Sequence, residues 1–337
     1  MSHDQHLALY RKYRPQTFSD VVGQEQLVTL LTTTIKQKKI AHAYLFCGSR
    51  GTGKTTVARI FARDIGCNPE DIIEIDAASN RGIDEIRELR DAVRTAPFSS
   101  PYKVYIVDEA HMLTGPAANA FLKTLEEPPS HVVFILATTD PDKLPQTIVS
   151  RCQKVVFKQP DIGTLSSRLI YVAEQEGKIL GKDGGELIAR HGKGSYRDAL
   201  GTLEQVLAIS KKEIKLDDIV KLLGTPEKES LLGLLRAVGG KDAKGIVGII
   251  SQLQSGNSSA VHSYDDMIEL VRQGLLMRIG ETTDGGELST IAKEYPYTIN
   301  SKTILELLEK KQLLEVSDAH AWTAFTAILL SLITTKV

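Results

Sequence analysis

The chain has 337 residues, enough for two or three domains, and its 42% hydrophobic and 25% charged residues are ordinary for a globular protein. Its 41 basic and 42 acidic residues give a net charge of −1, which argues against unconditional binding of nucleic acid, so any contact with a polyanion must be local. The separated cysteines Cys47, Cys67 and Cys152 form no Cys-x-x-Cys pair and favour free thiols in a reducing cytoplasm. The N-terminus lacks a signal-peptide core, and the apolar run at 321–333 is too short to span a bilayer and predicts a buried helix.

Residues 43–66 have the pattern of a strand, a glycine-rich turn and a helix. The apolar run AYLFC (43–47) predicts a short strand, CGSRGTGKTT (47–56) follows it, and residues 55–66 have a helical pattern. Further apolar runs suit buried parallel strands: DIIEIDA (71–77), KVYIVDEA (103–110) and HVVFILATT (131–139).

Helical patterns alternate with these runs, at residues 83–93 and 115–127. This alternation predicts a three-layer α/β nucleotide-binding domain with a parallel sheet over residues 1–157. Beyond that boundary the pattern is helical only, punctuated by glycine. We therefore expect two all-helical domains, at residues 158–224 and 225–337.

The glycine-rich turn has the complete spacing of a phosphate-binding loop. Its glycines let successive backbone N–H groups point at phosphate oxygens, its lysine adds positive charge at the β and γ phosphates, and the following threonine can ligate Mg²⁺. A chance turn is the alternative, and the strand before and the helix after argue against it. We expect the nucleotide-binding residues to be Gly48, Ser49, Arg50, Gly51, Thr52, Gly53, Lys54, Thr55 and Thr56.

The segment VYIVDEAH places two acidic residues at the end of a predicted buried strand. Such residues emerge at the carboxyl edge of a parallel sheet, beside the phosphate loop. We expect Asp108 to hold Mg²⁺, directly or through water, and Glu109 to polarise the attacking water. The alternative is that the pair only begins a helix. Because a kinase of small molecules does not need this pair, the sequence favours hydrolysis of a nucleoside triphosphate.

Four other residues are ambiguous from the sequence alone. Thr138 and Thr139 end the next predicted strand, where a hydroxyl could hold the attacking water or the γ phosphate, although on their own a capped strand end is the better explanation. Arg151 in SRC and Arg197 in GSYRDAL have the surroundings of solvated surface arginines.

Basic and aromatic residues precede the fold in YRKYRPQTFSDVVGQ (10–24). One interpretation of this segment is a basic arm. The other is a lip over the adenine of the bound nucleotide that includes Tyr10 and Arg11, with Val21 and Val22 against the base.

Together these motifs closely resemble the gamma/tau subunit family of the bacterial DNA polymerase III clamp loader. The similarity runs to about Leu223, and the remainder, to Val337, more loosely resembles the helical collar on which five subunits assemble. The resemblance implies an AAA+ ATPase domain, a helical lid and a collar, which load a sliding clamp onto primed DNA. It is carried by YRKYRPQTFSDVVGQ, HAYLFCGSRGTGKT, EIDAASNRGIDEIR, KVYIVDEAHML, AFLKTLEEPP, FILATTDPDKLPQTIVSRC and GSYRDAL.

The resemblance assigns roles at the nucleotide. Lys54 and Thr55 correspond to the phosphate-loop pair, Asp108 to the metal ligand and Glu109 to the water-activating base. Thr139 falls at the sensor-1 position. ATP and Mg²⁺ are therefore the implied cofactors.

The resemblance also implies roles away from the loop. Arg151 is similar to an arginine finger that reaches a neighbour's ATP, and Arg197 to the sensor-2 arginine that touches the γ phosphate in cis. Lys123 matches a basic residue that links DNA sensing to catalysis. A helix beginning near Arg81 and Gly82 is expected to face the DNA backbone, which suits a helix N-terminus and arginine.

Two departures from the family pattern bear on cofactors and partners. The family usually inserts a four-cysteine zinc module where this chain has GCNPEDIIEIDAAS with Cys67 alone, so we predict no zinc. The sequence ends at the expected collar, so relative to the family pattern we expect either a short form or a trimmed piece that lacks the tail for helicase or polymerase. The expected partners are other clamp-loader subunits in a hetero-pentamer, the sliding clamp and primer–template DNA, with no membrane.

Two other functions stay open at this point. A non-catalytic scaffold, like the stator subunits of such complexes, would not need Lys54, Asp108 and Glu109 together. Another AAA+ ATPase acting on DNA, for example in branch migration, would not explain the segments HAYLF, KTLEEPP and KLPQTIVSRC, although the missing zinc module leaves room for it.

Overall fold

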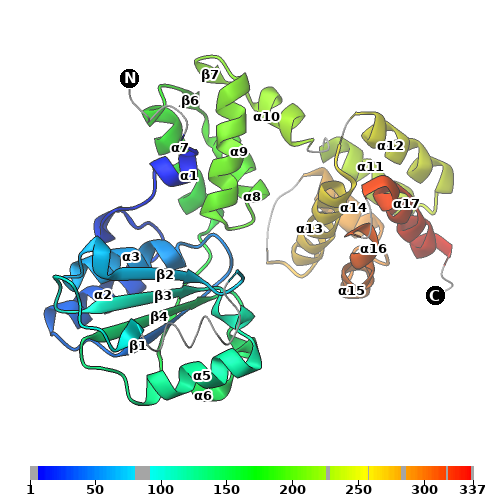
Figure 1. Cartoon of the computed structure of the whole chain (residues 1–337). Coiled ribbons are helices and arrows are strands. Elements are labelled where there is room, and N and C mark those ends of the chain that lie inside the picture. The colour runs from blue at the N-terminus through cyan, green and yellow to red at the C-terminus, as the bar shows by residue number, and fades with distance from the viewer. Residues whose placement is uncertain are drawn as a thin grey trace. The chain divides into compact units, whose positions relative to one another are not determined.

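The computed structural model describes residues 7–79, 92–224, 228–256, 258–281, 286–315 and 318–334 (Figure 1). The chain divides into two compact units, Met1–Leu216 and Asp217–Val337. The three-domain division predicted above stays a prediction. Most of the helix predicted at residues 83–93 lies outside the described residues.

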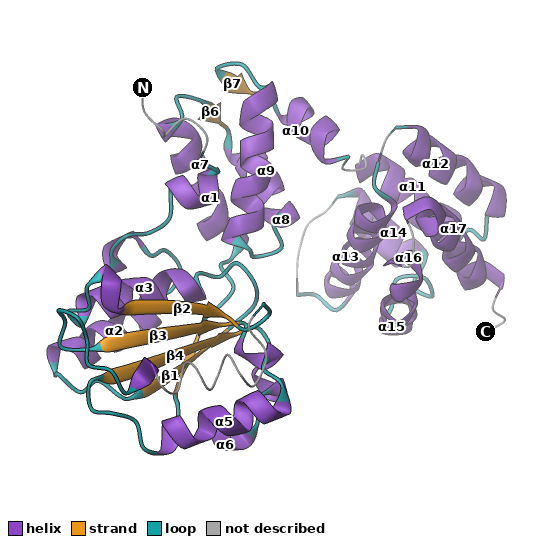
Figure 2. Ribbon diagram, viewed as in Figure 1, coloured by secondary structure: helices purple, strands orange, loops and turns teal. Residues whose placement is uncertain are grey.

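A five-stranded parallel sheet forms the centre of the first unit (Figure 2). Its strand order is β2-β3-β4-β1-β5, so β4 lies between β1 and β3. The four predicted strands are confirmed, and β1, β3 and β4 are apolar runs that are largely buried in the sheet. At the edge of the sheet, β2 is only partly buried. The strands are β1 (Ala43–Cys47), β2 (Ile72–Asp76), β3 (Lys103–Asp108), β4 (Val132–Thr138) and β5 (Gln153–Val156).

Helices cover both faces of this sheet and complete the predicted three layers (Figure 2). On one face Phe61 packs edge-on against Tyr44, with 4.9 Å between the ring centroids. On the other face Phe121 packs edge-on against Phe134 at 5.1 Å. The helices of this part are α1 (Leu9–Lys12), α2 (Glu25–Lys36), α3 (Lys54–Asp64), α5 (Gly115–Glu126) and α6 (Gln146–Val149), with 3₁₀ turns η2 (Phe18–Asp20), η3 (Pro69–Asp71), η4 (Ala110–Met112) and η5 (Pro141–Lys143).

A smaller helical part follows in the same unit, and α1 packs against it. It consists of α7 (Ile162–Gln175), α8 (Lys182–His191) and α9 (Tyr196–Ile209). A parallel pair of short strands, β6 (Ile179–Leu180) and β7 (Glu213–Ile214), joins its ends. The prediction of a purely helical pattern beyond residue 157 was wrong here, because strands of two residues are too short to show a period of two.

The second unit is helical throughout the residues that the structure describes. The predicted buried C-terminal helix is confirmed, because Phe325 is fully buried and packs against Tyr264 at 5.1 Å between ring centroids. The helices from Leu216 onward are α10 (Leu216–Leu223), α11 (Lys228–Gly239), α12 (Ala243–Ser255), α13 (Ala260–Arg278), α14 (Glu287–Glu294), α15 (Ser301–Lys310), α16 (Gln312–Glu315) and α17 (Asp318–Thr334).

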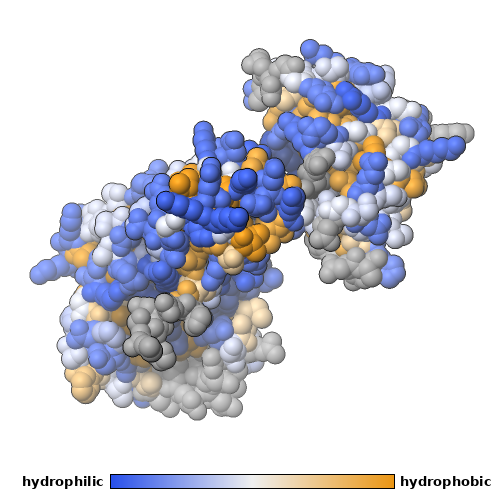
Figure 3. Space-filling view, turned by 90° about the horizontal axis from the view of Figure 1, so that it is seen from above, coloured by the Kyte–Doolittle hydropathy of each residue, from blue (hydrophilic) through white to orange (hydrophobic). Residues whose placement is uncertain are grey.

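Hydrophilic residues cover most of the face seen in Figure 3, with hydrophobic areas between them. Among the described helices, none combines the length and the apolar character needed to cross a membrane.

Asp71 anchors the loop that leads into β3. This residue is 1% exposed, and its carboxylate accepts hydrogen bonds from the backbone N–H groups of Phe98 at 2.6 Å and Ser99 at 3.1 Å. Burial alone would raise the pKa of Asp71, but the hydrogen bonds from residues 98–100 together outweigh it, so the pKa lies below the ordinary 3.8. The ionised carboxylate therefore stabilises the fold at neutral pH, and this contribution is lost as the pH falls below 3.8.

We expect Asp71→Ala to destabilise the first unit by about 1–3 kcal/mol at neutral pH, because two partly buried N–H groups lose their acceptor. Urea unfolding, followed by hydrogen exchange within Ile72–Asp76, measures this. Glu70→Ala is the matched control, since Glu70 is an exposed acidic neighbour. Equal free energies of unfolding for the two variants at neutral pH would contradict the assigned role of Asp71.

Candidate functional site

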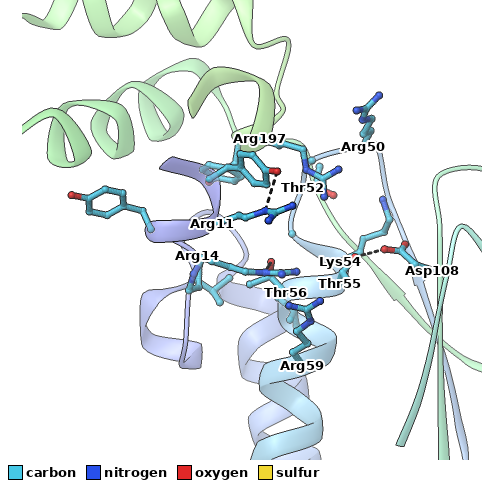
Figure 4. Close-up of a pocket in the computed structure, with 18 of the residues that line it drawn as sticks. Arg11, Arg14, Arg50, Thr52, Lys54, Thr55, Thr56, Arg59, Asp108 and Arg197 are labelled. Atoms are coloured by element: carbon cyan, nitrogen blue, oxygen red, sulfur yellow. Dashed lines mark hydrogen bonds between the residues drawn. The ribbon is translucent and has the colours of Figure 1, made fainter. Parts of the chain in front are cut away.

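A cleft of about 890 Å³ lies within the first unit, between the α/β part and the helical part (Figure 4). The phosphate loop, the ends of β2 and β3, the N-terminal segment and helices α7 and α9 line it. It brings together most of the residues predicted from the sequence. These are Tyr10, Arg11, Val21, Val22, Arg50, Gly51, Thr52, Gly53, Lys54, Thr55, Thr56, Asp108, Glu109 and Arg197.

The glycines of the loop are needed for its conformation and for close approach. Gly51 and Gly53 have φ of +75° and +101°, in the left-handed region that residues with a Cβ avoid. A Cβ at Gly51 would lie 1.9 Å from Oγ of Ser195 in the helical part, and one at Gly48 would lie 2.7 Å from Cβ of Phe157. The backbone of the loop is therefore free to form a concave cradle of N–H groups.

Lys54 is the first residue of α3 and is 6% exposed. Its Nζ donates to the carbonyl oxygens of Gly48 at 2.7 Å and Ser49 at 3.0 Å. Burial lowers the pKa of Lys54 below its ordinary value, while Glu109 and Asp108 act in the opposite direction. A buried ammonium group at a helix N-terminus, within a glycine-rich loop, fits a bound polyphosphate.

The predicted magnesium ligands are in direct contact. The hydroxyl of Thr55 donates to Oδ2 of Asp108 at 2.7 Å, and the backbone N–H of Glu109 donates to Oδ1 at 3.0 Å. Hydroxyl and carboxylate oxygens are the ligand types that Mg²⁺ prefers. Over the described ranges, no cluster of three or more His, Cys, Asp or Glu side chains is arranged to hold a metal ion by itself. This absence does not test the prediction of no zinc, which stays a prediction.

Glu109 follows β3 in a left-handed conformation, with φ of +48° and ψ of +44°. The hydroxyl of Thr139, at the end of β4, donates to Oε2 of Glu109 at 3.3 Å. The predicted sensor-1 residue and the predicted base are thus neighbours, because β3 and β4 are paired and end at the same edge of the sheet.

The N-terminal segment and the helical part meet at the other side of the cleft. The guanidinium carbon of Arg197 lies 5.8 Å from the ring centroid of Tyr10, and Arg11 donates from Nε to the hydroxyl of Tyr10 at 3.2 Å. Tyr196 donates from its hydroxyl to the carbonyl of Val22 at 2.9 Å. The expected adenine lip and the expected sensor-2 arginine therefore line the same cleft (Figure 4).

The structure reveals two site residues that the sequence reasoning missed. Arg14 donates from Nε to the hydroxyl of Thr56 at 2.9 Å, and burial lowers its pKa. Tyr196 also donates from its backbone N–H to the carbonyl of Gly51 at 3.0 Å, so it contacts both the phosphate loop and the N-terminal segment. Both residues lie in segments that stood out in the sequence, but no local pattern shows which partner each one reaches.

Arg151 and Lys123 are among the predicted residues that are not part of the cleft lining. Arg151 donates from Nη2 to Glu126 at 2.7 Å and from Nη1 to the carbonyl of Thr147 at 2.8 Å. Lys123 is exposed on α5. The predicted DNA contacts at residues 81–82, Arg81 and Gly82, lie outside the described residues.

The parallel sheet, the glycine-rich loop with its buried lysine and the acidic pair together define a P-loop ATPase fold of the AAA+ class. The fold resembles solved structures of a RuvB protein from Thermotoga maritima. One, a "Holliday junction branch migration motor", has 20% identity and a TM-score of 0.54 and covers 67% of this chain and 79% of that one. A point variant of the same RuvB protein gives 19% identity with the same TM-score and coverage. At these identities the likeness shows the fold alone.

Sequence comparisons give the family. A family model described as "DNA polymerase III, delta subunit" matches residues 23–81 and 69–161. DNA polymerase III subunit tau of Bacillus subtilis (strain 168) is 40% identical over 299 residues, which cover 82% of this chain and 53% of that protein. Subunit tau of Escherichia coli (strain K12) is 35% identical over 304 residues, covering 84% and 47%. The chain belongs to the DNA polymerase III tau/gamma subunit family, and it spans about half the length of these relatives.

We expect Gly51→Ala to lower the affinity for ATP at least tenfold, because the new Cβ would clash with Ser195 and strain the loop. Gly53→Ala separates the two effects: its φ is also left-handed, but its Cβ would meet nothing within 4 Å. Gly115→Ala, in open space without a left-handed φ, is the control. Titration with a fluorescent ATP analogue measures the affinities. Wild-type affinity in Gly51→Ala would show that the contact with Ser195 does not shape the loop.

Proposed function

We propose that this chain is an ATPase motor subunit of a DNA polymerase III clamp loader, which uses ATP binding and hydrolysis to load a sliding clamp onto primed DNA. Membership of the tau/gamma family supports the biological setting. The observation that carries the enzymatic part is the buried Lys54 in its glycine cradle, beside the Thr55–Asp108 pair and Glu109. A non-catalytic scaffold would not need this set of groups.

Each of these groups has a separate task in the proposed reaction. The backbone N–H groups of the loop and Lys54 bind the phosphates, and Thr55 and Asp108 would hold Mg²⁺. The metal ion, when bound, neutralises charge that develops on the phosphate oxygens. Glu109 orients and polarises the attacking water, with Thr139 at its carboxylate. Arg197 touches the γ phosphate from the helical part of the same chain.

Arg151 acts in trans in this proposal. Its guanidinium pairs with Glu126 outside the cleft lining, so it is available to a neighbouring subunit rather than to its own nucleotide. Residues 225–337 are the proposed collar of a hetero-pentamer, and Lys123, Arg81 and Gly82 are the proposed DNA-facing residues. A cytoplasmic location follows from a role in replication.

We expect Lys54→Ala to abolish ATP binding and clamp loading, because the loop loses the cation that faces the phosphates. Lys39→Ala, at an exposed lysine, is the matched control. Fluorescent ATP titration and loading of the clamp onto primed DNA, with the partner subunits present, measure the two losses. Clamp loading that survives in Lys54→Ala would show that ATP binding at this site is not the driver.

We expect Arg151→Ala to lower turnover by about 10³-fold or more while ATP affinity is kept, as for an arginine finger supplied in trans. Glu126→Ala breaks the surface ion pair but leaves the arginine, so it shows whether a loss of turnover comes from the loss of the finger or from the loss of the pair. Phosphate release is measured against protein concentration, with and without primed DNA, clamp and partner subunits. Turnover that does not depend on protein concentration, primed DNA or clamp would contradict the clamp-loader role and leave only a general AAA+ ATPase.

A further inference from the structure

We propose that His111 is a positioning residue that holds the carboxylate of Glu109 against the end of β4 and links it to the phosphate loop. The inference rests on the proposed function, because it assigns a support to the proposed base. His111 lies in the 3₁₀ turn Ala110–Met112, directly after Glu109, and its side chain is 12% exposed.

The contacts of His111 point in two directions. Nδ1 lies 3.0 Å from the hydroxyl oxygen of Thr138, within hydrogen-bond distance. The same atom lies 3.6 Å from Oε2 of Glu109, which is a close electrostatic contact but too long for a hydrogen bond. The donor in the pair with Thr138 depends on the tautomer of the ring. With the proton on Nδ1, the ring donates to the hydroxyl of Thr138 and brings that N–H group close to the carboxylate of Glu109, which can only accept.

Thr138 is a rigid anchor for this arrangement. It is fully buried at the end of β4, and its hydroxyl oxygen also accepts from the backbone N–H of Asp140 at 3.0 Å. Its carbonyl accepts from the backbone N–H of Gly48, the first glycine of the phosphate loop, at 3.2 Å. One residue thus contacts the phosphate loop through its carbonyl and His111 through its hydroxyl.

Glu109 needs such a support. Its backbone is in the left-handed region, which few non-glycine residues adopt, and its side chain is 34% exposed. The hydrogen bond from Thr139 is long, at 3.3 Å. A carboxylate held by one long hydrogen bond at an open cleft can rotate into solvent, and loss of alignment with the attacking water lowers the rate steeply. His111 covers the same oxygen from the side of the 3₁₀ turn and restricts that rotation.

The test uses the full chain in its clamp-loader assembly. We expect His111→Leu to lower kcat at least tenfold while the ATP affinity stays within twofold of wild type. His111→Asn should recover most of kcat, because an asparagine amide places a donor near the position of Nδ1. His42→Asn, an exposed histidine in the turn before β1, is the matched control. Thermal unfolding of each variant shows that the fold is kept.

A double-mutant comparison with Glu109→Gln separates this inference from the proposed function. If Glu109→Gln lowers turnover to a measurable residual rate and His111→Leu in that background lowers it no further, His111 acts through Glu109. If Glu109→Gln keeps its activity, the proposed base is wrong and the inference falls with it. If Glu109→Gln is inactive but His111→Leu alone has normal or raised kcat, only the inference is overturned. An additive loss in the double variant also overturns it.

Discussion

The burial of the Lys54 ammonium group is the constraint on which the rest of the site depends. An isolated buried charge is strongly unfavourable, and here two loop carbonyls and the nearby carboxylates Asp108 and Glu109 compensate it in part. The loop that carries these carbonyls contains two left-handed residues, Gly51 and Gly53. A polyphosphate supplies the remaining compensation. The buried charge that is unfavourable in the free protein therefore favours binding of the ligand.

The strand order places everything else around this cation. Because β4 lies between β1 and β3, the phosphate loop and the acidic pair emerge on either side of Thr138. Gly48 and His111 both contact that residue, so the cradle and the proposed base share one rigid support. The helical part is joined to the same site by Tyr196, which donates to Gly51 and Val22. A change at the nucleotide therefore has direct routes to the sheet and to the helices.

The strands and the phosphate loop were predictable because their signals are local. Runs such as AYLFC are buried on both faces, and the spacing of Gly48, Gly53 and Lys54 is itself the pattern of a phosphate-binding loop. The edge strand β5 was not foreseen, since it has only four residues, begins with the polar Gln153 and Lys154, and buries only Val155 fully. The partners of Arg14, His111 and Tyr196 were not predictable either. Each partner lies far from its residue in the sequence, or on a neighbouring strand whose register is set only by the fold.

The position of Arg151 can be weighed in the same terms. Its pair with Glu126 is partly solvated, and such pairs contribute about 0–1 kcal/mol. An arginine finger that raises a rate roughly 10³- to 10⁵-fold lowers the barrier by about 4–7 kcal/mol. On the proposal that Arg151 is such a finger, loss of its pair with Glu126 costs little beside the transition-state stabilisation that it would supply to an aligned neighbouring subunit. Under the proposed function, Glu109 is the base beside its own phosphate loop and Arg151 is the finger outside its own cleft. On that proposal, alignment of subunits, rather than binding of ATP alone, is the step at which DNA and clamp would control turnover.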